Sequence, residues 1–530
     1  MDSYDYVVVG GGSSGATLAS RLSEDARCRV LLLEAGGDGD SWMHRMPFAI
    51  SALVPRPNRH NWGFETVPQP GLGGRRGYQP RGRGLGGSSG INAMVYVRGH
   101  RNDYDRWAAQ GNPGWSYDEV LPFFTRSECN ETLDGPFHGR SGPLHVGEQR
   151  SGNLFTGHFI QAAVQAGHRY NPDVNGAEQE GVTRFQLNQV GGERCSAARA
   201  FLAPHRGRPN LTVRTHCHAT RVLIEDRRVV GVEFLYGGGR HTVRARREVV
   251  LAAGVFQSPQ LLMLSGIGHG SQLQALGIAV QHHLPGVGEN LQDHIDHVLV
   301  RRCDSPELVG LSARGLWRLG GHWRAWRRER RGLLCSNAAE AGAFLKTRPD
   351  LPEPDIQLHF VVAMLEQHGR KLRMGHGLSV HVCCLRPRSR GTVRLESADP
   401  QAAPRIDPAF LDDPQDLETL LAGYRMAERI LAQPALSAHG LRTLERHPPR
   451  SDDEVRAAIR AGADTIFHPV GTCRMGPDPL AVVDAHLRVH GIRGLRVADA
   501  SVIPSAIGGN THACCVMVGE RAAHLMREAA

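Results

Sequence analysis

The sequence has no uninterrupted apolar run that approaches the roughly 20 residues needed to span a membrane. Ahead of the strand expected from Tyr4 there is no charged leader, apolar core and cleavage site of the secretory type. Hydrophobic residues make up 41% and charged residues 22%, which is ordinary for a globular protein. These features predict a cytoplasmic protein without a membrane-spanning segment.

Lysine is nearly absent. Lys346 and Lys371 are the only two among 62 basic residues, so the formal net charge of +9 comes almost wholly from arginine. No basic tail and no basic module interleaved with aromatic residues occurs, so we expect no nucleic-acid partner. Arginine favours acidic surfaces, and peripheral contact with the inner face of a membrane therefore stays open.

One arginine-rich segment is the candidate for such membrane contact. Between Arg314 and Arg331, Trp323 and Trp326 lie three residues apart among arginines, on one face of an expected helix. Such a helix either packs its tryptophans inward as part of a second domain, or lies on an anionic membrane surface where a quinone acceptor would be met.

Metal-binding spacings are also missing. The 28 histidines and eleven cysteines include no H-E-x-x-H, no C-x-x-C and no paired Cys/His spacing of the zinc type. We therefore expect no metal site. We also expect reduced, buried cysteines, as in a cytosolic protein.

The first 36 residues contain a dinucleotide fingerprint. A strand ends at Gly10, the G-x-G-x-x-G pattern continues through Gly12 and Gly15 into a helix, and a second apolar run ends at Glu34. The three glycines permit the tight turn, the approach of a pyrophosphate and close helix–strand packing, respectively. The positive end of the helix then faces the phosphates. A carboxylate at Glu34 takes ribose hydroxyls and disfavours a 2′-phosphate, so the pattern favours FAD or NAD over NADP.

The rest of the chain predicts more than one domain, because 530 residues are too many for a single core. Residues 55–90 are rich in Gly, Pro and Arg and predict a long loop spread over a ligand. Residues 210–250 are strand-rich. Residues 300–460 instead combine an Arg/Trp-rich helix with strands and a further helix, and they predict a second domain that covers the cofactor. Helices are expected over 117–126, 258–264, 314–331, 414–432 and 513–528, and strands over 355–364, 377–386 and 494–499.

Six segments in this order resemble the glucose–methanol–choline (GMC) family of flavoprotein oxidoreductases. Besides the fingerprint they are residues 80–99, 254–268, 284–294, 467–476 and 497–512. The resemblance covers nearly the whole chain, and within the family it is similar to the choline-dehydrogenase-like and alcohol-dehydrogenase-like members.

The resemblance implies an α/β fold in which a discontinuous Rossmann-like FAD-binding domain is joined to an α+β substrate-binding domain with an antiparallel sheet. We expect the FAD-binding domain over residues 1–155, 206–300 and 465–530, the last part carrying the catalytic residues. Residues 156–205 form a connecting, substrate-side segment, and 301–464 form the substrate-binding cap.

The resemblance also implies FAD rather than a free nicotinamide. Asp499 ends a late strand, where its carboxylate suits ribityl or pyrophosphate-side hydroxyls, and the glycine-rich loop 84–90 offers unobstructed backbone N–H groups. By resemblance, Ser88, Asn92 and Met94 lie along the isoalloxazine or pyrophosphate, and Val222 offers its backbone to the adenine. The predicted cofactor-binding set is Gly10, Gly12, Ser13, Ser14, Gly15, Glu34, Ala35, Trp62, Arg81, Gly87, Ser88, Asn92, Ala93, Met94, Val95, Val222, Ala253, Asp499, Ala500, Asn510 and Thr511.

Some family members attach the flavin covalently through a histidine in this loop. Aligned on Asn92, that position is Ile91 in this sequence, and isoleucine has no nucleophilic nitrogen. We therefore expect non-covalent FAD.

The resemblance identifies His468 as the catalytic base, in the rigid turn Phe-His-Pro-Val-Gly-Thr. An alcohol must lose its hydroxyl proton while its carbon delivers a hydride to flavin N5, and a neutral imidazole suits the first task. Asn510 matches the second catalytic position, where an amide holds the alkoxide but accepts no proton. An alternative is that the pair slips by two and His512 faces the substrate.

These features predict an FAD-dependent dehydrogenase that oxidises a small-molecule alcohol to an aldehyde or ketone and passes electrons to a quinone or another acceptor that is not NAD. An oxidase that uses O2, a flavin-containing hydroxynitrile lyase and a light-driven decarboxylase remain alternatives on the same fold. Glu340 either attracts a cationic substrate such as choline or serves as a structural hydrogen-bonding acid. The sequence predicts neither the alcohol nor the oligomeric state.

Overall fold

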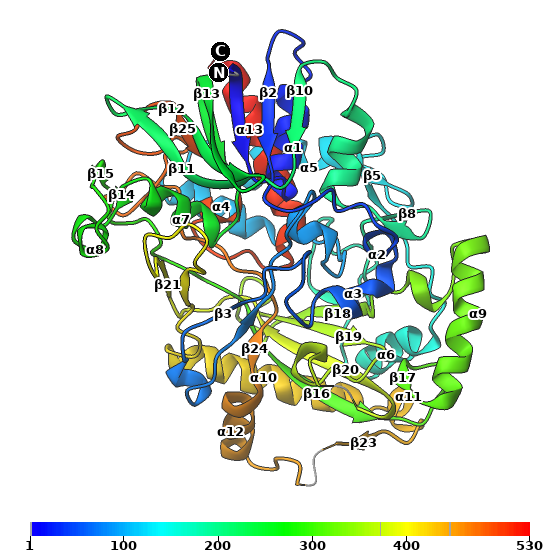
Figure 1. Ribbon diagram of the computed structural model, residues 1–530. Helices are drawn as coiled ribbons and strands as arrows, with labels where there is room; N and C mark the ends of the chain where they lie inside the picture. Colours follow the sequence, from blue (N-terminus) through cyan, green and yellow to red (C-terminus); the bar gives the residue numbers. More distant parts are fainter. Residues whose placement is uncertain (1–2, 372, 445–446, 530) are drawn as a thin grey trace.

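Two large β-sheets organise the computed structural model, which describes residues 3–371, 373–444 and 447–529 (Figure 1). The first sheet runs in the order β10 (Leu211–Arg214), β2 (Val30–Leu33), β1 (Ser3–Val9), β13 (Gly239–Leu251), β12 (Arg228–Tyr236), β11 (His218–Glu225), and β25 (Leu495–Val497) pairs with β13. The second runs in the order β23 (Arg442–Thr443), β16 (Ile295–Arg302), β20 (Gly375–Cys384), β19 (Ile356–Val361), β18 (Ala339–Leu345), β7 (Gly181–Arg184), with β17 (Gly310–Leu311) on β20 and β24 (Asp464–Thr465) on β16. The α/β architecture with an added antiparallel sheet is as the sequence predicts.

The first sheet is parallel at its centre. β10, β2, β1, β25 and the second half of β13 all point the same way, and their apolar side chains are buried. A strand with a near-continuous apolar run is stable there because both of its faces are covered. The first half of β13 continues beyond this centre as an antiparallel ribbon with β12 and β11.

Two helices from opposite ends of the sequence pack together beside this sheet. They are α1 (Ser13–Leu22) and α13 (Thr511–Glu528), and Figure 1 shows both chain ends in the same part of the molecule. Gly519 permits the close approach, because a Cβ added there would lie 2.6 Å from the carbonyl oxygen of Ser14. The N- and C-terminal segments therefore build one core.

The second sheet separates its side chains strictly by face. On β19, Ile356, Leu358 and Phe360 pack under α10 (Pro414–Leu431) and α6 (Leu154–Gln165), where Phe360 stacks on Phe159 at 4.7 Å. Alternate residues of a strand point to opposite faces, so Gln357, His359 and Val361 face the other way. This opposite face is the one that borders the cavity described below.

The predicted helices are found as α5 (Tyr117–Ser127), α7 (Gln257–Leu264), α9 (Ala313–Glu329), α10 and α13. Residues 55–90 contain only the short strands β3 (Phe64–Glu65) and β4 (Tyr78–Gln79) and single 3-10 turns, as a long loop should. Helices α4 (Arg101–Ala109), α6 and α12 (Asp452–Gly462) were not predicted. The predicted domain limits stay a prediction, and β16 crosses the one at residue 300 because it belongs to the second sheet.

Within the described residues, no helix has both the length and the apolar character that a membrane crossing requires. All eleven cysteines are free thiols, and nine of them are buried.

Candidate active site

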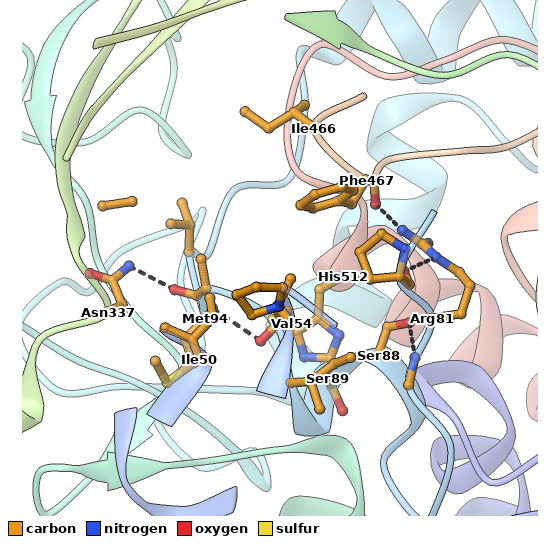
Figure 2. A pocket seen from close by; sticks show the side chains of 18 of the residues that line it. Ile50, Val54, Arg81, Ser88, Ser89, Met94, Asn337, Ile466, Phe467 and His512 are labelled. Atoms are coloured by element: carbon orange, nitrogen blue, oxygen red, sulfur yellow. Dashed lines mark hydrogen bonds between the residues drawn. The ribbon is translucent and has the colours of Figure 1, made fainter. Parts of the chain in front are cut away.

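One cavity of about 680 Å³ lies between the two sheets. Its walls come from the carboxyl edge of the parallel strands, the loop from Pro80 to Val95, the outward face of β19 and β20, and the segments 466–469 and 510–512. Figure 2 shows Phe467 and Arg81 on one side of this cavity and Met94 with Asn337 on another. In an open parallel sheet, ligands bind at this edge.

The fingerprint forms a cradle at one end of the cavity. Gly10 has φ +104°, and the Cβ of an alanine at Gly15 would lie 1.9 Å from the Gly10 carbonyl oxygen. Gly12, in contrast, has only the Gly87 Cα at 4.0 Å from an added Cβ. Helix α1 begins there without a side-chain cap or an acidic residue in its first turn, so its N–H groups are available to phosphates.

The carboxylate of Glu34 closes the first βαβ unit. Its oxygens accept hydrogen bonds from the peptide N–H groups of Gly11, Gly36 and Gly84 at 2.8, 2.8 and 2.9 Å. Glu34 is buried and lines the cavity, and an ionised carboxylate has lone pairs left for ribose hydroxyls. The residues present therefore fit the adenosine half of FAD.

Asp499 occupies the equivalent place at the end of β25. It accepts hydrogen bonds from the Gly254 N–H at 2.9 Å, the Ser258 hydroxyl at 2.6 Å and the Ser501 N–H at 2.8 Å. These bonds hold the loops after β13 and β25 side by side at the cavity wall, where Asp499 is one of the lining residues.

The loop between Pro80 and Val95 is held in a strained shape. Met94 has φ +59°, and its N–H donates to the Asn92 side-chain oxygen at 3.0 Å. Beneath the loop, the buried Arg194 donates to the Asn92 carbonyl at 2.7 Å and to its side-chain oxygen at 2.8 Å. Burial lowers the pKa of Arg194 to about 9. Backbone strain of this kind is typical of ligand-binding loops.

His468 lies at the other end of the cavity, at the centre of a hydrogen-bonded chain. Its Nε2 is 3.1 Å from the Asn510 Nδ2, and its Nδ1 is 3.1 Å from the Nδ1 of His294. Gln357 donates to the Asn510 side-chain oxygen at 3.1 Å, and the His468 N–H donates to Asp293 at 2.9 Å. The two predicted catalytic residues are thus in direct contact.

The backbone next to His468 is also strained. Phe467 has φ +73°, which is rare for a bulky residue, and it is held by a hydrogen bond from its N–H to the Thr465 hydroxyl at 2.7 Å. Its carbonyl accepts from Arg81 at 2.8 Å (Figure 2). The imidazole is therefore positioned by its backbone as well as by its neighbours.

The electrostatics of this end favour a neutral imidazole. Burial, followed by the nearby His294, His359 and Arg81, holds the pKa of His468 well below its ordinary value of 6.5. A neutral His468, whose Nε2 is engaged only by the Asn510 amide, is suited to accept a proton from a ligand that replaces this amide.

His512 lies at the fingerprint end instead. Its Nδ1 is 2.9 Å from the Ser13 hydroxyl, and no hydrogen bond links it to His468 or Asn510 among the described contacts. Burial, then Arg194, lowers the pKa of His512 to about 4. This arrangement does not favour the alternative in which His512 replaces Asn510 at the substrate.

Nearly all predicted cofactor-binding residues line the cavity together. The lining includes Gly10, Gly12, Ser13, Ser14, Glu34, Ala35, Trp62, Arg81, Gly87, Ser88, Asn92, Ala93, Met94, Val95, Ala253, Asp499, Ala500, Asn510 and Thr511. Gly15 lies beneath the cradle, where it permits close packing rather than contact with a ligand.

Val222, predicted to offer its backbone to the adenine, is not among the residues that line the cavity. Its side chain is in the core, and its N–H donates to the Ser265 hydroxyl at 2.9 Å. Ala219, three residues earlier on β11, does line the cavity. The residue of β11 that borders the cavity is thus three positions before the one that the sequence predicted.

The sequence reasoning missed one wall of the cavity. His359 and His381 line it from β19 and β20, and Asn337 donates to the Ala93 carbonyl at 2.7 Å. Alternation along residues 356–361 was the available signal, because it places His359 opposite the apolar face.

Glu340 does not face the cavity. It is fully buried on β18, where the hydroxyls of Thr156 and Ser336 donate to its carboxylate at 2.6 and 2.5 Å. Burial raises its pKa. Of the two alternatives that the sequence left open for Glu340, the structure favours a structural hydrogen-bonding acid.

Comparison with known proteins gives concordant matches. The family models for GMC oxidoreductases match residues 4–296 and 387–519. The chain is 44% identical to an alcohol dehydrogenase [acceptor] of Pseudomonas putida, over 99% of this chain and 95% of that one. It is 42% identical to the mitochondrial choline dehydrogenase of Homo sapiens, over 99% and 90% of the two chains.

Solved structures agree with the sequence matches. Pyridoxine 4-oxidase from Mesorbium loti is 33% identical with a TM-score of 0.88, and the match covers 99% of each chain. A formate oxidase from Aspergillus oryzae, studied for modification of its FAD, is 28% identical with a TM-score of 0.92, covering 100% of this chain and 98% of that one.

Proposed function

Because the chain belongs to the GMC oxidoreductase family, we propose that it oxidises an alcohol with His468 as the base. As a member of this family it is an FAD-dependent oxidoreductase that acts on CH–OH donors. The contact between His468 and Asn510 inside the cavity is the observation that carries the proposal.

The roles follow from the atoms at this contact. The His468 Nε2 takes the hydroxyl proton once the alcohol replaces the Asn510 amide at its lone pair, since its low pKa keeps the ring neutral. The Asn510 amide donates to the alkoxide as the proton leaves. FAD, when bound, accepts the hydride from the carbinol carbon. Burial of the His468 side chain limits the access of water that would compete for the proton.

We propose that FAD is held without a covalent bond. Ile91 lies in the cavity lining at the position where some family members have a linking histidine. Glu34, Asp499 and the start of α1 supply polar contacts along the length expected for the dinucleotide.

The charges of the cavity support an uncharged alcohol rather than a quaternary ammonium. Among the described lining residues the carboxylates are Glu34, Asp499 and Glu307. The first two lie at the dinucleotide end and accept backbone hydrogen bonds, and Glu307 pairs with Arg318 at 3.2 Å. A cation next to His468 would have no carboxylate partner to offset its desolvation.

The proposed electron acceptor is a quinone or an electron-transfer partner other than NAD. The similarity to a protein named as an alcohol dehydrogenase [acceptor] supports it. Relatives named as oxygen-dependent choline dehydrogenases keep an oxidase as the second candidate. Peripheral contact with the inner face of a membrane belongs to this proposal, since quinones reside there.

Anaerobic mixing with an alcohol panel tests the function. We expect linear aliphatic or benzylic alcohols to bleach the visible absorbance of the purified yellow protein, and choline to leave it unchanged. Slow return of colour in air identifies a dehydrogenase, and rapid return an oxidase. A flavin that no alcohol bleaches would contradict alcohol oxidation and favour a lyase or a light-driven decarboxylase.

A further inference from the structure

The mouth of the cavity has an unusually apolar border. Of the ten large hydrophobic side chains exposed in the described residues, five line the cavity or lie within two positions of a lining residue. One of them, Trp323, packs against Trp42, which leaves Leu154, Leu311, Trp317 and Met374. Leu311 lines the cavity itself, and each of the others lies within two positions of a lining residue. Trp317 is 83% exposed. We call these four residues the apolar rim.

The same border carries most of the net positive charge. Residues 313–331 contain seven arginines and one glutamate, a formal +6 against +9 for the whole chain. On α9, Arg324, Arg327 and Arg328 are exposed on the helix face that also presents Trp317. No ion pair joins these three arginines to any described residue, whereas Arg318 and Arg330 are paired.

The opposite face of α9 holds the helix in place. Trp326 is buried, its indole N–H donates to the Gly192 carbonyl at 3.4 Å, and Trp323 meets Trp42 edge to face at 6.0 Å. Gly315, Arg318 and His322 line the cavity from this inner side. Figure 1 shows α9 at one edge of the molecule, so its outer face is not covered by another element.

We infer that the apolar rim and the outer face of α9 dock on an anionic lipid bilayer, with the cavity mouth turned toward the lipid. Tryptophan is favoured at the membrane–water interface, and unpaired arginines are attracted to anionic headgroups. Since protein interfaces are also enriched in tryptophan, methionine and arginine, a second copy of the chain on this face is the competing outcome of the test below. The inference rests on the proposed function for its consequence: the alcohol is one that dissolves in lipid and enters from the bilayer.

Vesicle co-sedimentation without substrate tests this docking. We expect the holoenzyme to sediment with vesicles that contain phosphatidylcholine and phosphatidylglycerol, but not with vesicles of phosphatidylcholine alone. High salt should release the bound protein. The triple variant Arg324→Glu, Arg327→Glu, Arg328→Glu should lower the partition coefficient at least about 10-fold, and Trp317→Ser should lower it separately. The matched control is Arg240→Glu, Arg244→Glu, Arg246→Glu on the exposed part of β13, which should bind as the wild type does.

Failure of docking and failure of the function are separable, because flavin bleaching by a water-soluble alcohol needs no vesicles. Absence of binding to anionic vesicles, or equal loss in the α9 and β13 variants, would overturn the docking. If light scattering shows a dimer that the α9 substitutions convert to monomer, this face binds a second copy of the chain, and the docking on lipid is overturned as well.

A second inference comes from the hydrogen bonds behind His468. The Asn510 Nδ2 is only a donor, and Gln357 fixes its orientation by donating to the Asn510 oxygen. The His468 Nε2 must therefore accept, which places the proton of the neutral ring on Nδ1. That Nδ1–H then donates to the Nδ1 of His294, so His294 carries its own proton on Nε2.

We propose that His294 is a positioning residue, which selects the tautomer of His468 whose Nε2 lone pair faces the alcohol. His294 is fully buried, and its Nε2 has no hydrogen-bond partner among the described residues, so its contact with His468 is the hydrogen bond that orients its ring. Burial, then Arg386, lowers its pKa to about 4 despite the opposing effect of Asp103, so it stays an acceptor at neutral pH. It acts on the reaction through His468 and does not line the cavity.

Two variants and one spectrum test this role. His294→Leu removes the acceptor, and we expect flavin reduction about 100-fold slower, because a wrong tautomer of a base costs up to about 10⁴-fold. His294→Asn places an amide oxygen near the Nδ1 position and should restore most of the rate. The ¹⁵N shifts of the wild-type holoenzyme should show His468 protonated on Nδ1 before any substrate is added.

Equal rates in the Leu and Asn variants, with equal melting temperatures, would reduce His294 to packing and overturn the inference. A wild-type spectrum with the His468 proton on Nε2 would also overturn it, even if the Leu variant fails to fold. The spectrum does not depend on whether an alcohol bleaches the flavin, so it separates failure of this inference from failure of the proposed function.

Discussion

His468→Ala should lower the rate of flavin reduction by alcohol about 10²–10⁴-fold while leaving FAD bound. A positioned base contributes this much to proton transfer, and the residues that line the dinucleotide end of the cavity are untouched. Rapid mixing under anaerobic conditions measures the rate, and the flavin spectrum measures FAD content. Added imidazole should recover part of the rate, because the substitution leaves room for it in the cavity.

The matched control for this substitution is His512→Gln. His512 also lines the cavity but contacts Ser13 rather than Asn510, so its replacement should leave flavin reduction close to the wild-type rate. Comparable losses in both variants would reopen the alternative in which His512 faces the substrate. Full activity of His468→Ala would exclude it as the base.

The same residue fixes the pH dependence. His468 accepts a proton only when neutral, and its pKa lies well below 6.5 because of burial and then of its histidine neighbours. The rate of flavin reduction should therefore be level from about pH 6.5 to 8 and fall only when acid protonates the ring. A rate that rises through pH 7 would show that this imidazole is not the base.

Gly15→Ala should remove both FAD and stability. The added Cβ would lie 1.9 Å from the Gly10 carbonyl oxygen, so the turn or α1 must shift. Overpacking of this kind costs about 1–3 kcal/mol or more, and each kcal/mol lowers the melting temperature by roughly 2–4 °C in domains of 150–250 residues. Thermal melting of the FAD-free protein measures the loss.

Gly12→Ala separates cofactor binding from folding. Its Cβ would meet only the Gly87 Cα at 4.0 Å, so the FAD-free protein should melt as the wild type does. The methyl group faces the expected phosphate path, and a loss of about 2.7 kcal/mol raises the Kd for FAD about 100-fold.

Fluorescence titration after acid removal of the flavin measures this Kd. Flavin that acid does not release would contradict non-covalent binding. Equal melting losses in both variants would refute the distinction between these glycines.

Local patterns were enough to predict the fingerprint and the long helices. The turn at Gly10, the acid at Glu34 and the apolar periodicity of α10 and α13 are each set by residues close in sequence. Alternation along residues 356–361 places His359 opposite the apolar face, but no local pattern shows that this face, on which His359 pairs with His381, meets the cavity beside the first sheet. His294 was interpreted as one of many scattered histidines for the same reason.

The position of Val222 on β11 was not predictable for a different reason. That the Ala-Thr-Arg-Val stretch lies near the adenine stays a prediction. A strand exposes alternate residues, and no sequence signal fixed the point at which β11 leaves the cavity. Ala219 borders the cavity and Val222 belongs to the core.

The packing of α13 against α1 sets an order of events during biosynthesis. The fingerprint leaves the ribosome first, yet β25 and α13, which complete its sheet and cover its first helix, are translated about 480 residues later. Until then the edge of β13 that receives β25 stays open and the phosphate cradle lacks the helix that holds Ser14 in place. We therefore expect FAD to bind only to an essentially finished chain, so that a chain released before residue 495 should contain no flavin.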